Sequence, residues 1–150
     1  NSVYLTNDFW KMDVQYRFDN FNKKAVRILN DILKQTDAEI VISSDWKYDC
    51  TLEEMQDLFK QYGVLKGPID YTPSLTMEDF QGLELVKAEY EAERALEIKK
   101  WLALNPSVTK WVAIDDLNMT PHLDNFVHTI KQNEGIKQSG VKEKIISYLK

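Results

Sequence analysis

The chain has 150 residues, of which 43% are hydrophobic and 29% charged, as in a soluble globular domain and unlike a disordered or membrane-embedded chain. Its net charge of −5 at pH 7 argues against a protein that coats nucleic acid through bulk electrostatics, but leaves room for a local basic pocket. The single cysteine, Cys50, excludes an internal disulfide framework, and no apolar run is long enough to span a membrane. We therefore expect a cytoplasmic protein with no membrane partner and no bulk binding of duplex nucleic acid.

Helices and strands are predicted in alternation over the first half of the chain. Residues 1–20 are rich in aromatic side chains and have no clear period, whereas residues 22–35 have the pattern of an amphipathic helix. A short apolar strand is predicted over 39–43. A second helix begins at Thr51, which is followed three residues later by a glutamate in the spacing of a capping box, and it ends near Gly63.

The second half continues this alternation. An irregular insert with one short strand is predicted over about residues 64–83. After it we expect a long helix over 84–104, strands over 110–114 and 126–129, and a closing amphipathic helix over 141–149. The order predicts one α/β domain that spans the whole chain, with a mostly parallel sheet and helices on both faces.

Two of the predicted strands stop abruptly at polar residues. The first ends in Ser43 and Ser44, and the second runs into Asp115 and Asp116. Ligands of open α/β sheets bind at the carboxyl ends of the strands. Hydroxyl groups there could bind a phosphoryl oxygen, and carboxylates are ligands for Mg²⁺. Taken alone, each pair is more simply explained as a turn or a helix cap.

A cation is predicted on the buried side of the long helix. A charge on a core-facing stripe must be paired or must reach a site. The alternative is an ordinary ion pair with Glu91 or Glu97 on the same helix. Together with the hydroxyls and carboxylates, however, Arg94 completes the set of groups that a phosphoryl group and its Mg²⁺ require. The stripe consists of Arg94, Ile98, Trp101 and Leu102.

The order of these residues resembles that of haloacid dehalogenase-like (HAD) phosphatases, in which a serine, a helical arginine and an aspartate pair follow one another. A response-regulator receiver domain uses similar residues but places its acidic pair first. The likeness is closest to the HAD domain of Swiss Army Knife RNA repair proteins and covers roughly residues 20–150. Its motifs correspond to Ile40–Lys47 (IVISSDWK), Thr72–Leu75 (TPSL), Arg94–Leu102 (RALEIKKWL) and Trp111–Asp116 (WVAIDD).

The resemblance implies a fold and a reaction. The fold would be a three-layer, Rossmann-like α/β domain, and the reaction a Mg²⁺-dependent hydrolysis of a phosphate monoester. The acidic surface and the small insert favour a phosphorylated small molecule or a nucleic-acid terminus over duplex DNA as the substrate. Removal of phosphate from RNA ends is suggested by the family's name alone.

The resemblance also implies roles for individual residues. Ser43 would bind the transferred phosphoryl group, and Arg94 would neutralise the charge that develops on it. Lys47 stands where the family usually has an arginine, which weakens the case for a phosphate contact from it. The implied phosphate ligands are Ser43, Ser44, Lys47 and Arg94, and the implied metal ligands are Asp115 and Asp116.

Such phosphatases carry a D-x-D motif on a central first strand, between the strands that bear the serine and the aspartate pair. One of its aspartates attacks phosphorus to form an aspartyl-phosphate, and the other acts as acid and base. The early acidic residues of this chain follow no apolar strand. We therefore expect the D-x-D strand upstream of residue 1, and a sheet that lacks its first central strand. The alternative is an inactive HAD-like module that binds a phosphorylated ligand or a partner without cleaving it.

Overall fold

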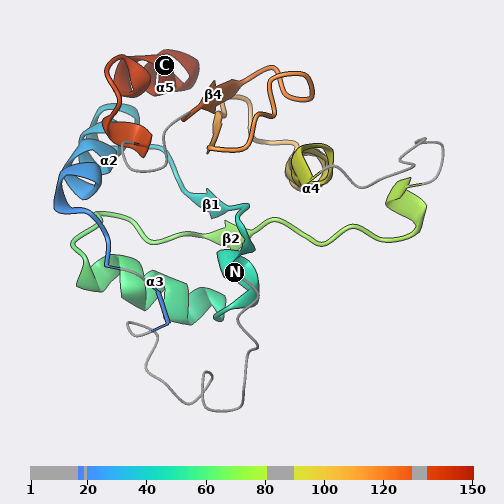
Figure 1. Ribbon diagram of the computed structural model, residues 1–150, viewed down its shortest axis with the longest axis horizontal. Coiled ribbons are helices and arrows are strands. Elements are labelled where there is room, and N and C mark those ends of the chain that lie inside the picture. The colour runs from blue at the N-terminus through green and yellow to red at the C-terminus, as the bar shows by residue number, and fades with distance from the viewer. Residues whose placement is uncertain (1–16, 19, 81–89, 130–134) are drawn as a thin grey trace.

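The computed structural model describes residues 17–18, 20–80, 90–129 and 135–150 (Figure 1). Helices and strands alternate in it, as the sequence predicts. The helices are α2 (Lys23–Thr36), α3 (Leu52–Gln61), α4 (Tyr90–Leu104) and α5 (Val141–Leu149); the strands are β1 (Val41–Ile42), β2 (Asp70–Tyr71), β3 (Ala113–Asp115) and β4 (Phe126–His128); and the short 3₁₀-helices are η2 (Asp45–Tyr48), η3 (Glu78–Phe80) and η4 (Gly135–Lys137).

The helix ends follow from side-chain capping. At the start of α2, Asn22 Oδ1 accepts the backbone N–H of Ala25 at 3.0 Å, which satisfies one of the free donors of the first turn. The predicted capping box of α3 is present, since Thr51 Oγ1 accepts the Glu54 N–H and Glu54 Oε1 accepts the Thr51 N–H, each at 3.1 Å. The predicted long helix ends at Leu104 as expected, and the first part of its range lies outside the described residues.

The strands are shorter than predicted, and they form two sheets. In the described part of the chain, β1 pairs only with β2 and β3 only with β4, both in parallel. The predicted range 39–43 shrinks to two residues, and the predicted range 110–114 shifts toward the acidic pair, so that Asp115 is itself part of β3 and lies opposite His128. The predicted bounds were wrong because strand length is set by the pairing partner, which apolar patterning does not show.

Three apolar clusters hold these elements together. The first joins α2, β1 and α3 around Leu33, Met55 and Leu58. The second packs α4 against the segment that leads to β4, around Ala95 and Met119. The third joins α2, β4 and α5 and contains Ile32, Val127 and Ile145.

The two small sheets lie between different helices (Figure 1). Helix α3 lies on the side of β1 and β2 that faces away from β4, whereas α4, β4 and α5 lie on the other side. Helix α5 packs beside α2, and Lys142 Nζ lies 3.1 Å from the Asp31 carboxylate. This is a mixed α/β fold with parallel strand pairs. Within the described residues, no helix has both the length and the apolar character needed to cross a bilayer.

Candidate active site

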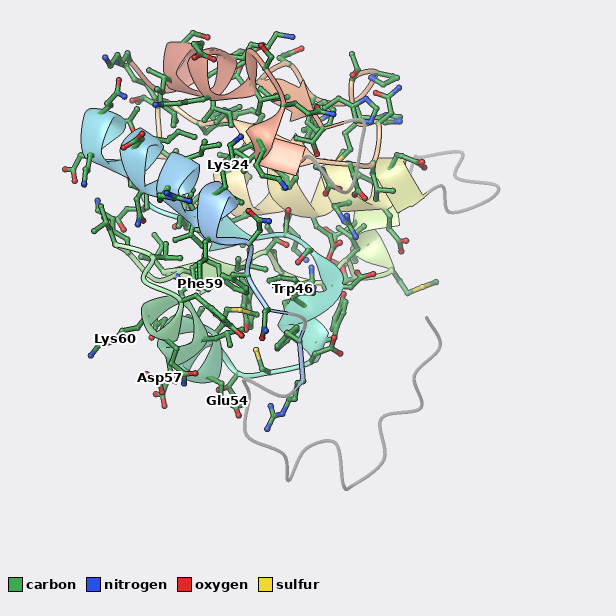
Figure 2. The ribbon with its side chains drawn as sticks, turned by 60° about the vertical axis from the view of Figure 1, so that its left-hand side comes forward. Lys24, Trp46, Glu54, Asp57, Phe59 and Lys60 are labelled. Atoms are coloured by element: carbon green, nitrogen blue, oxygen red, sulfur yellow. The ribbon has the colours of Figure 1, made fainter. Side chains whose placement is uncertain are left out.

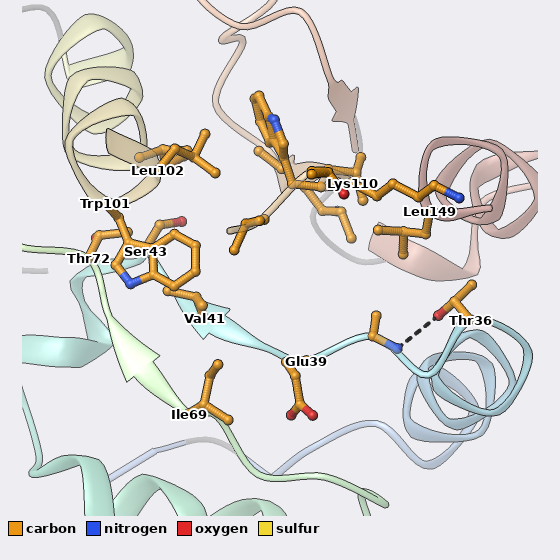
Figure 3. A pocket seen from close by; sticks show the side chains of 18 of the residues that line it. Thr36, Glu39, Val41, Ser43, Ile69, Thr72, Trp101, Leu102, Lys110 and Leu149 are labelled. Atoms are coloured by element: carbon orange, nitrogen blue, oxygen red, sulfur yellow. Dashed lines mark hydrogen bonds between the residues drawn. The ribbon is translucent and has the colours of Figure 1, made fainter. Parts of the chain in front are cut away.

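A cavity of about 500 Å³ lies between the two sheets (Figure 3). One wall comes from β1 and the segment after β2, the opposite wall from the segment that leads into β3, and α4 closes one side. Most of its lining is apolar. Residues that line this inter-sheet cavity include Val41, Ser43, Thr72, Trp101, Val112 and Ile114.

Among the described residues, β1 and β3 each have one edge without a strand partner, and these two edges face the cavity. The carbonyl groups of Ile40 and Ile42 accept hydrogen bonds from the β2 side, so the backbone groups of Val41 between them point to the other edge of β1. In β3, Ala113 and Asp115 bond to the β4 side, and Ile114 points away in the same manner. Val41 and Ile114 both line the cavity. Two parallel strands therefore present hydrogen-bonding edges to one shared space.

Arg94 of α4 joins the carboxyl ends of β1 and β3. Its Nη1 donates to the Asp115 carboxylate at 2.8 Å, and its Nη2 lies 3.6 Å from the Asp45 carboxylate just after β1. The side chains of Arg94 and Asp115 are 13% and 8% exposed, so this ion pair is shielded from water, whereas Asp45 is exposed. The buried cation that the sequence predicts is confirmed, but its partners are strand-end aspartates, and the alternative of Glu91 or Glu97 was wrong.

Burial and a neighbouring carboxyl group both act on Asp115. Burial raises the pKa of Asp115, and the adjacent Asp116 carboxyl adds to this effect; together they outweigh the Leu117 N–H and Arg94, which lower it. Asp115 Oδ1 accepts the Leu117 N–H at 3.0 Å, so this aspartate also caps the turn after β3, as the simpler explanation held. One arginine thus lies among three carboxylates, a surplus of negative charge that favours a cation.

The two serines after β1 have different surroundings. Ser43 lines the inter-sheet cavity, at the end of β1 where a ligand is expected (Figure 3). Ser44 caps η2, because its Oγ accepts the Trp46 N–H at 3.4 Å. Ser44 therefore has the capping role that is the alternative to phosphate binding. Ser43 lines the cavity.

Lys47 is a buried bridge between three segments. Its side chain is 4% exposed, and Nζ forms an ion pair with the Glu97 carboxylate of α4. Nζ also donates to Thr72 Oγ1 at 3.1 Å, just after β2. To reach a phosphate, as the sequence predicts, Lys47 would have to leave these partners.

The aspartate pair fits a Mg²⁺ ion, although it does not form a complete cage. Mg²⁺ is commonly held by one or two carboxylates, with waters and substrate phosphate in the other positions. Asp115 and Asp116 supply two carboxylates close enough for one to raise the pKa of the other, which a bound cation would relieve. Within the described residues, no group of three or more histidine, cysteine or acidic side chains is placed to hold a metal.

Sequence reasoning missed three members of this arrangement. Asp45 was part of a motif without a role, Glu97 was considered only as a partner of Arg94, and His128 was placed on a predicted strand without a role in this site. His128 Nε2 lies 2.9 Å from the Asp116 carbonyl oxygen. The spacing of Arg94 and Glu97, three residues apart on one helix, was the available signal that both side chains lie on the same side of α4.

The chain matches a known protein family over most of its length. A family model described as the HAD domain in Swiss Army Knife RNA repair proteins matches residues 3–141. Neither the search of curated proteins nor the search of solved structures gave a match.

Proposed function

We propose, from the premise that this chain belongs to the family of HAD domains in Swiss Army Knife RNA repair proteins, that it is a Mg²⁺-dependent phosphohydrolase of phosphate monoesters. One observation carries the proposal. Arg94 connects Asp115 at the end of β3 with Asp45 after β1, at the edge of the sheets where ligands of α/β proteins bind. The family membership suggests nucleic-acid ends as substrates, beside small phosphorylated molecules.

Each residue of the site would act on one part of the reaction. Ser43 would donate a hydrogen bond to the transferred phosphoryl group from its place on the cavity wall. Arg94 would neutralise the charge that spreads over the equatorial oxygens, and its partial burial strengthens this effect. Asp115 and Asp116 would hold Mg²⁺, whose chemistry when bound is to offset negative charge on the phosphate.

The nucleophile would come from a strand seated in the inter-sheet cavity. A strand from outside the described residues, seated between β1 and β3, would pair with both free edges and join the two sheets into one Rossmann-like sheet. Its D-x-D motif would end beside Arg94. The first aspartate would attack phosphorus as the ester P–O bond breaks, and the second would protonate the leaving oxygen and then activate the water that hydrolyses the aspartyl-phosphate.

Phosphate release from p-nitrophenyl phosphate, with and without Mg²⁺, tests the proposal. The chain as its native gene encodes it should release phosphate only with Mg²⁺, and Asp115→Asn should remove this activity, whereas the Asp57→Asn control should keep it. Asp57 is an exposed residue of α3 (Figure 2) and does not line the inter-sheet cavity. Phosphate release that is independent of Mg²⁺ and of Asp115 would contradict the proposal. A complete lack of release would favour the inactive binding module.

A further inference from the structure

A second hollow lies against Trp46 of η2. It has a volume of about 330 Å³ and an almost entirely apolar lining. Figure 2 shows Trp46 near the amino-terminal end of α2, the helix that forms another wall of this space. Residues that line this Trp46 hollow include Asn20, Phe21, Asn22, Ala25, Trp46 and Phe59.

Aromatic rings hold the indole of Trp46 in place. The ring of Phe21 is stacked on it with centroids 5.7 Å apart, and Phe18 lies tilted against it at 5.0 Å. Phe21 is stacked in turn on Tyr62 at 4.5 Å and meets Phe59 edge-on at 5.3 Å. Despite these contacts Trp46 is 38% exposed. A fixed aromatic surface that remains partly open is suited to stacking with a flat ligand.

Two asparagines border the same hollow. Asn20 Oδ1 accepts the Tyr62 hydroxyl at 2.7 Å, and Asn22 Oδ1 accepts the Ala25 N–H at 3.0 Å. These bonds engage the oxygen of each amide, and the NH₂ group of an asparagine is a hydrogen-bond donor. A mainly apolar hollow with a few directional polar groups is the usual character of a small-ligand site. Ring nitrogens and carbonyl oxygens of a nucleobase are acceptors for such donors.

The Trp46 hollow is connected to the candidate phosphate site through two consecutive residues of η2. Trp46 follows Asp45 in the chain, and consecutive Cα atoms are about 3.8 Å apart. Asp45 is in turn the exposed partner of Arg94. We take a phosphoryl group at Arg94 and a ring in the Trp46 hollow to be parts of one ligand.

We propose that the Trp46 hollow binds the nucleobase next to the terminal phosphate of a single-stranded nucleic acid. This inference rests on the proposed function, since it takes the terminal phosphate to lie at Arg94. It selects a nucleic-acid end over a small phosphorylated metabolite. A net charge of −5 agrees with recognition of one terminal nucleotide rather than of a long polyanion. Single-stranded ends offer unstacked bases for such a contact.

Equilibrium binding of short, fluorescently labelled RNA oligonucleotides tests the inference without requiring turnover. The probes carry a 5′- or a 3′-phosphate at the unlabelled end, each with a matched probe whose terminal nucleotide lacks its base. The base should strengthen binding by about 5- to 100-fold, the range that stacking on one aromatic side chain supplies. Trp46→Leu should remove this difference, and Trp46→Phe should keep most of it.

Two further variants guard against a folding defect. Ala25→Leu, which fills the hollow from α2 with a good helix former, should also remove the preference for the base. Tyr48→Leu is the matched control, because Tyr48 is 53% exposed on the same 3₁₀-helix but does not line the hollow. Equal binding of intact and base-free ends, or a loss only in Tyr48→Leu, would overturn the inference.

The two proposals fail in different ways. Base-dependent binding without release of phosphate from any substrate would contradict the proposed phosphohydrolase activity but support the nucleobase site. Mg²⁺-dependent release from p-nitrophenyl phosphate, with no effect of the terminal base on binding or turnover of RNA ends, would support the enzyme and overturn the nucleobase site.

Discussion

The Arg94 guanidinium and the Asp115 carboxylate lie 2.8 Å apart, although each is expected to serve a different part of the ligand. Arg94 is suited to phosphate and Asp115 to a cation, but in the structure each neutralises the other. Mg²⁺ bound at Asp115 would weaken the ion pair between Asp115 and Arg94, and phosphate bound at Arg94 would free the Asp115 carboxylate to bind the metal. Binding of the two ligands should therefore be mutually favourable.

Arg94→Gln should destabilise the fold. It leaves the buried carboxylate of Asp115 without its cation, which typically lowers the free energy of unfolding by about 3 kcal/mol. Urea denaturation measures this change, with Arg27→Gln on the exposed side of α2 as the control, expected within about 0.5 kcal/mol of wild type. A cycle with Asp115→Asn should give a coupling free energy of at least about 1 kcal/mol. Additive effects would show that the pair contributes nothing to the fold.

Mg²⁺ should stabilise the chain through Asp115. A ligand that binds only the folded state at 100 times its dissociation constant adds about 2.7 kcal/mol to the free energy of unfolding. The melting temperature should therefore rise with Mg²⁺, and excess EDTA should reverse the rise. Asp115→Asn keeps an acceptor for the Leu117 N–H but should lose the response to the metal. The prediction fails if Asp115→Asn responds as fully as wild type and Asp57→Asn.

Lys47 and Glu97 should behave as a structural pair. Lys47→Met leaves the Glu97 carboxylate largely buried without its cation, and should lower the free energy of unfolding by about 3 kcal/mol. Lys47→Met combined with Glu97→Leu should recover most of this loss, because an apolar pair of similar volume often replaces a buried ion pair without penalty. Denaturant midpoints of the single and double variants provide the measurement. If Lys47→Met left the free energy of unfolding unchanged, Lys47 would not be a structural residue, and a role as a phosphate ligand would be favoured instead.

The start of α3 should make folding sensitive to acid. Partial burial would raise the pKa of Glu54, but the Thr51 N–H and Arg17, whose Nη2 lies 3.0 Å from Glu54 Oε2, hold that pKa below its usual range. A carboxyl with a lowered folded-state pKa stabilises above its unfolded pKa of about 4.3 and loses this effect as the pH falls through the folded value. Glu54→Gln should lower stability at pH 7 by about 1 kcal/mol and flatten its decline below pH 5. A pH series of denaturation curves checks both; Glu53→Gln, on the exposed side of α3, is the control.

The thiol of Cys50 should react slowly. Burial raises the pKa of Cys50, whose side chain is 4% exposed and whose Sγ lies 3.4 Å from the Tyr71 hydroxyl. A smaller thiolate fraction and limited access should make its reaction with Ellman's reagent at pH 8 at least about tenfold slower than in the denatured chain. Equal rates in the two states would place Cys50 at the surface.

Sequence patterning predicted the elements better than their connections. Helix starts such as Thr51 depend on local capping, so a few neighbouring residues determine them. The pairing of β1 with β2 joins Val41 to Asp70 across a segment that contains α3, and no local pattern encodes such a partner. For the same reason, the sequence predicted the buried charge of Arg94 but not its partner.

The site was predictable as a set of residue types and not as a set of contacts. The serines, Arg94 and the aspartates stood out by their places at strand ends and on a helix stripe. Whether Ser44 caps a helix or Lys47 bridges to Glu97 depends on distances between segments that only the folded chain fixes. Lys47 is the clearest example. The sequence predicted it as a phosphate ligand, but in the structure it is paired with the Glu97 carboxylate.

The packing of α5 against α2 has a consequence for the order of folding. The first apolar cluster is formed within residues 18–71 and the second within residues 95–126, so each can assemble from segments near one another in the chain. The third needs both parts at once, since it joins Ile32 to Ile145. Contacts of such long sequence separation are slow to form because the chain between them loses entropy when it closes. We expect the carboxyl-terminal helix to dock last in refolding and to exchange its amide hydrogens first in the native protein.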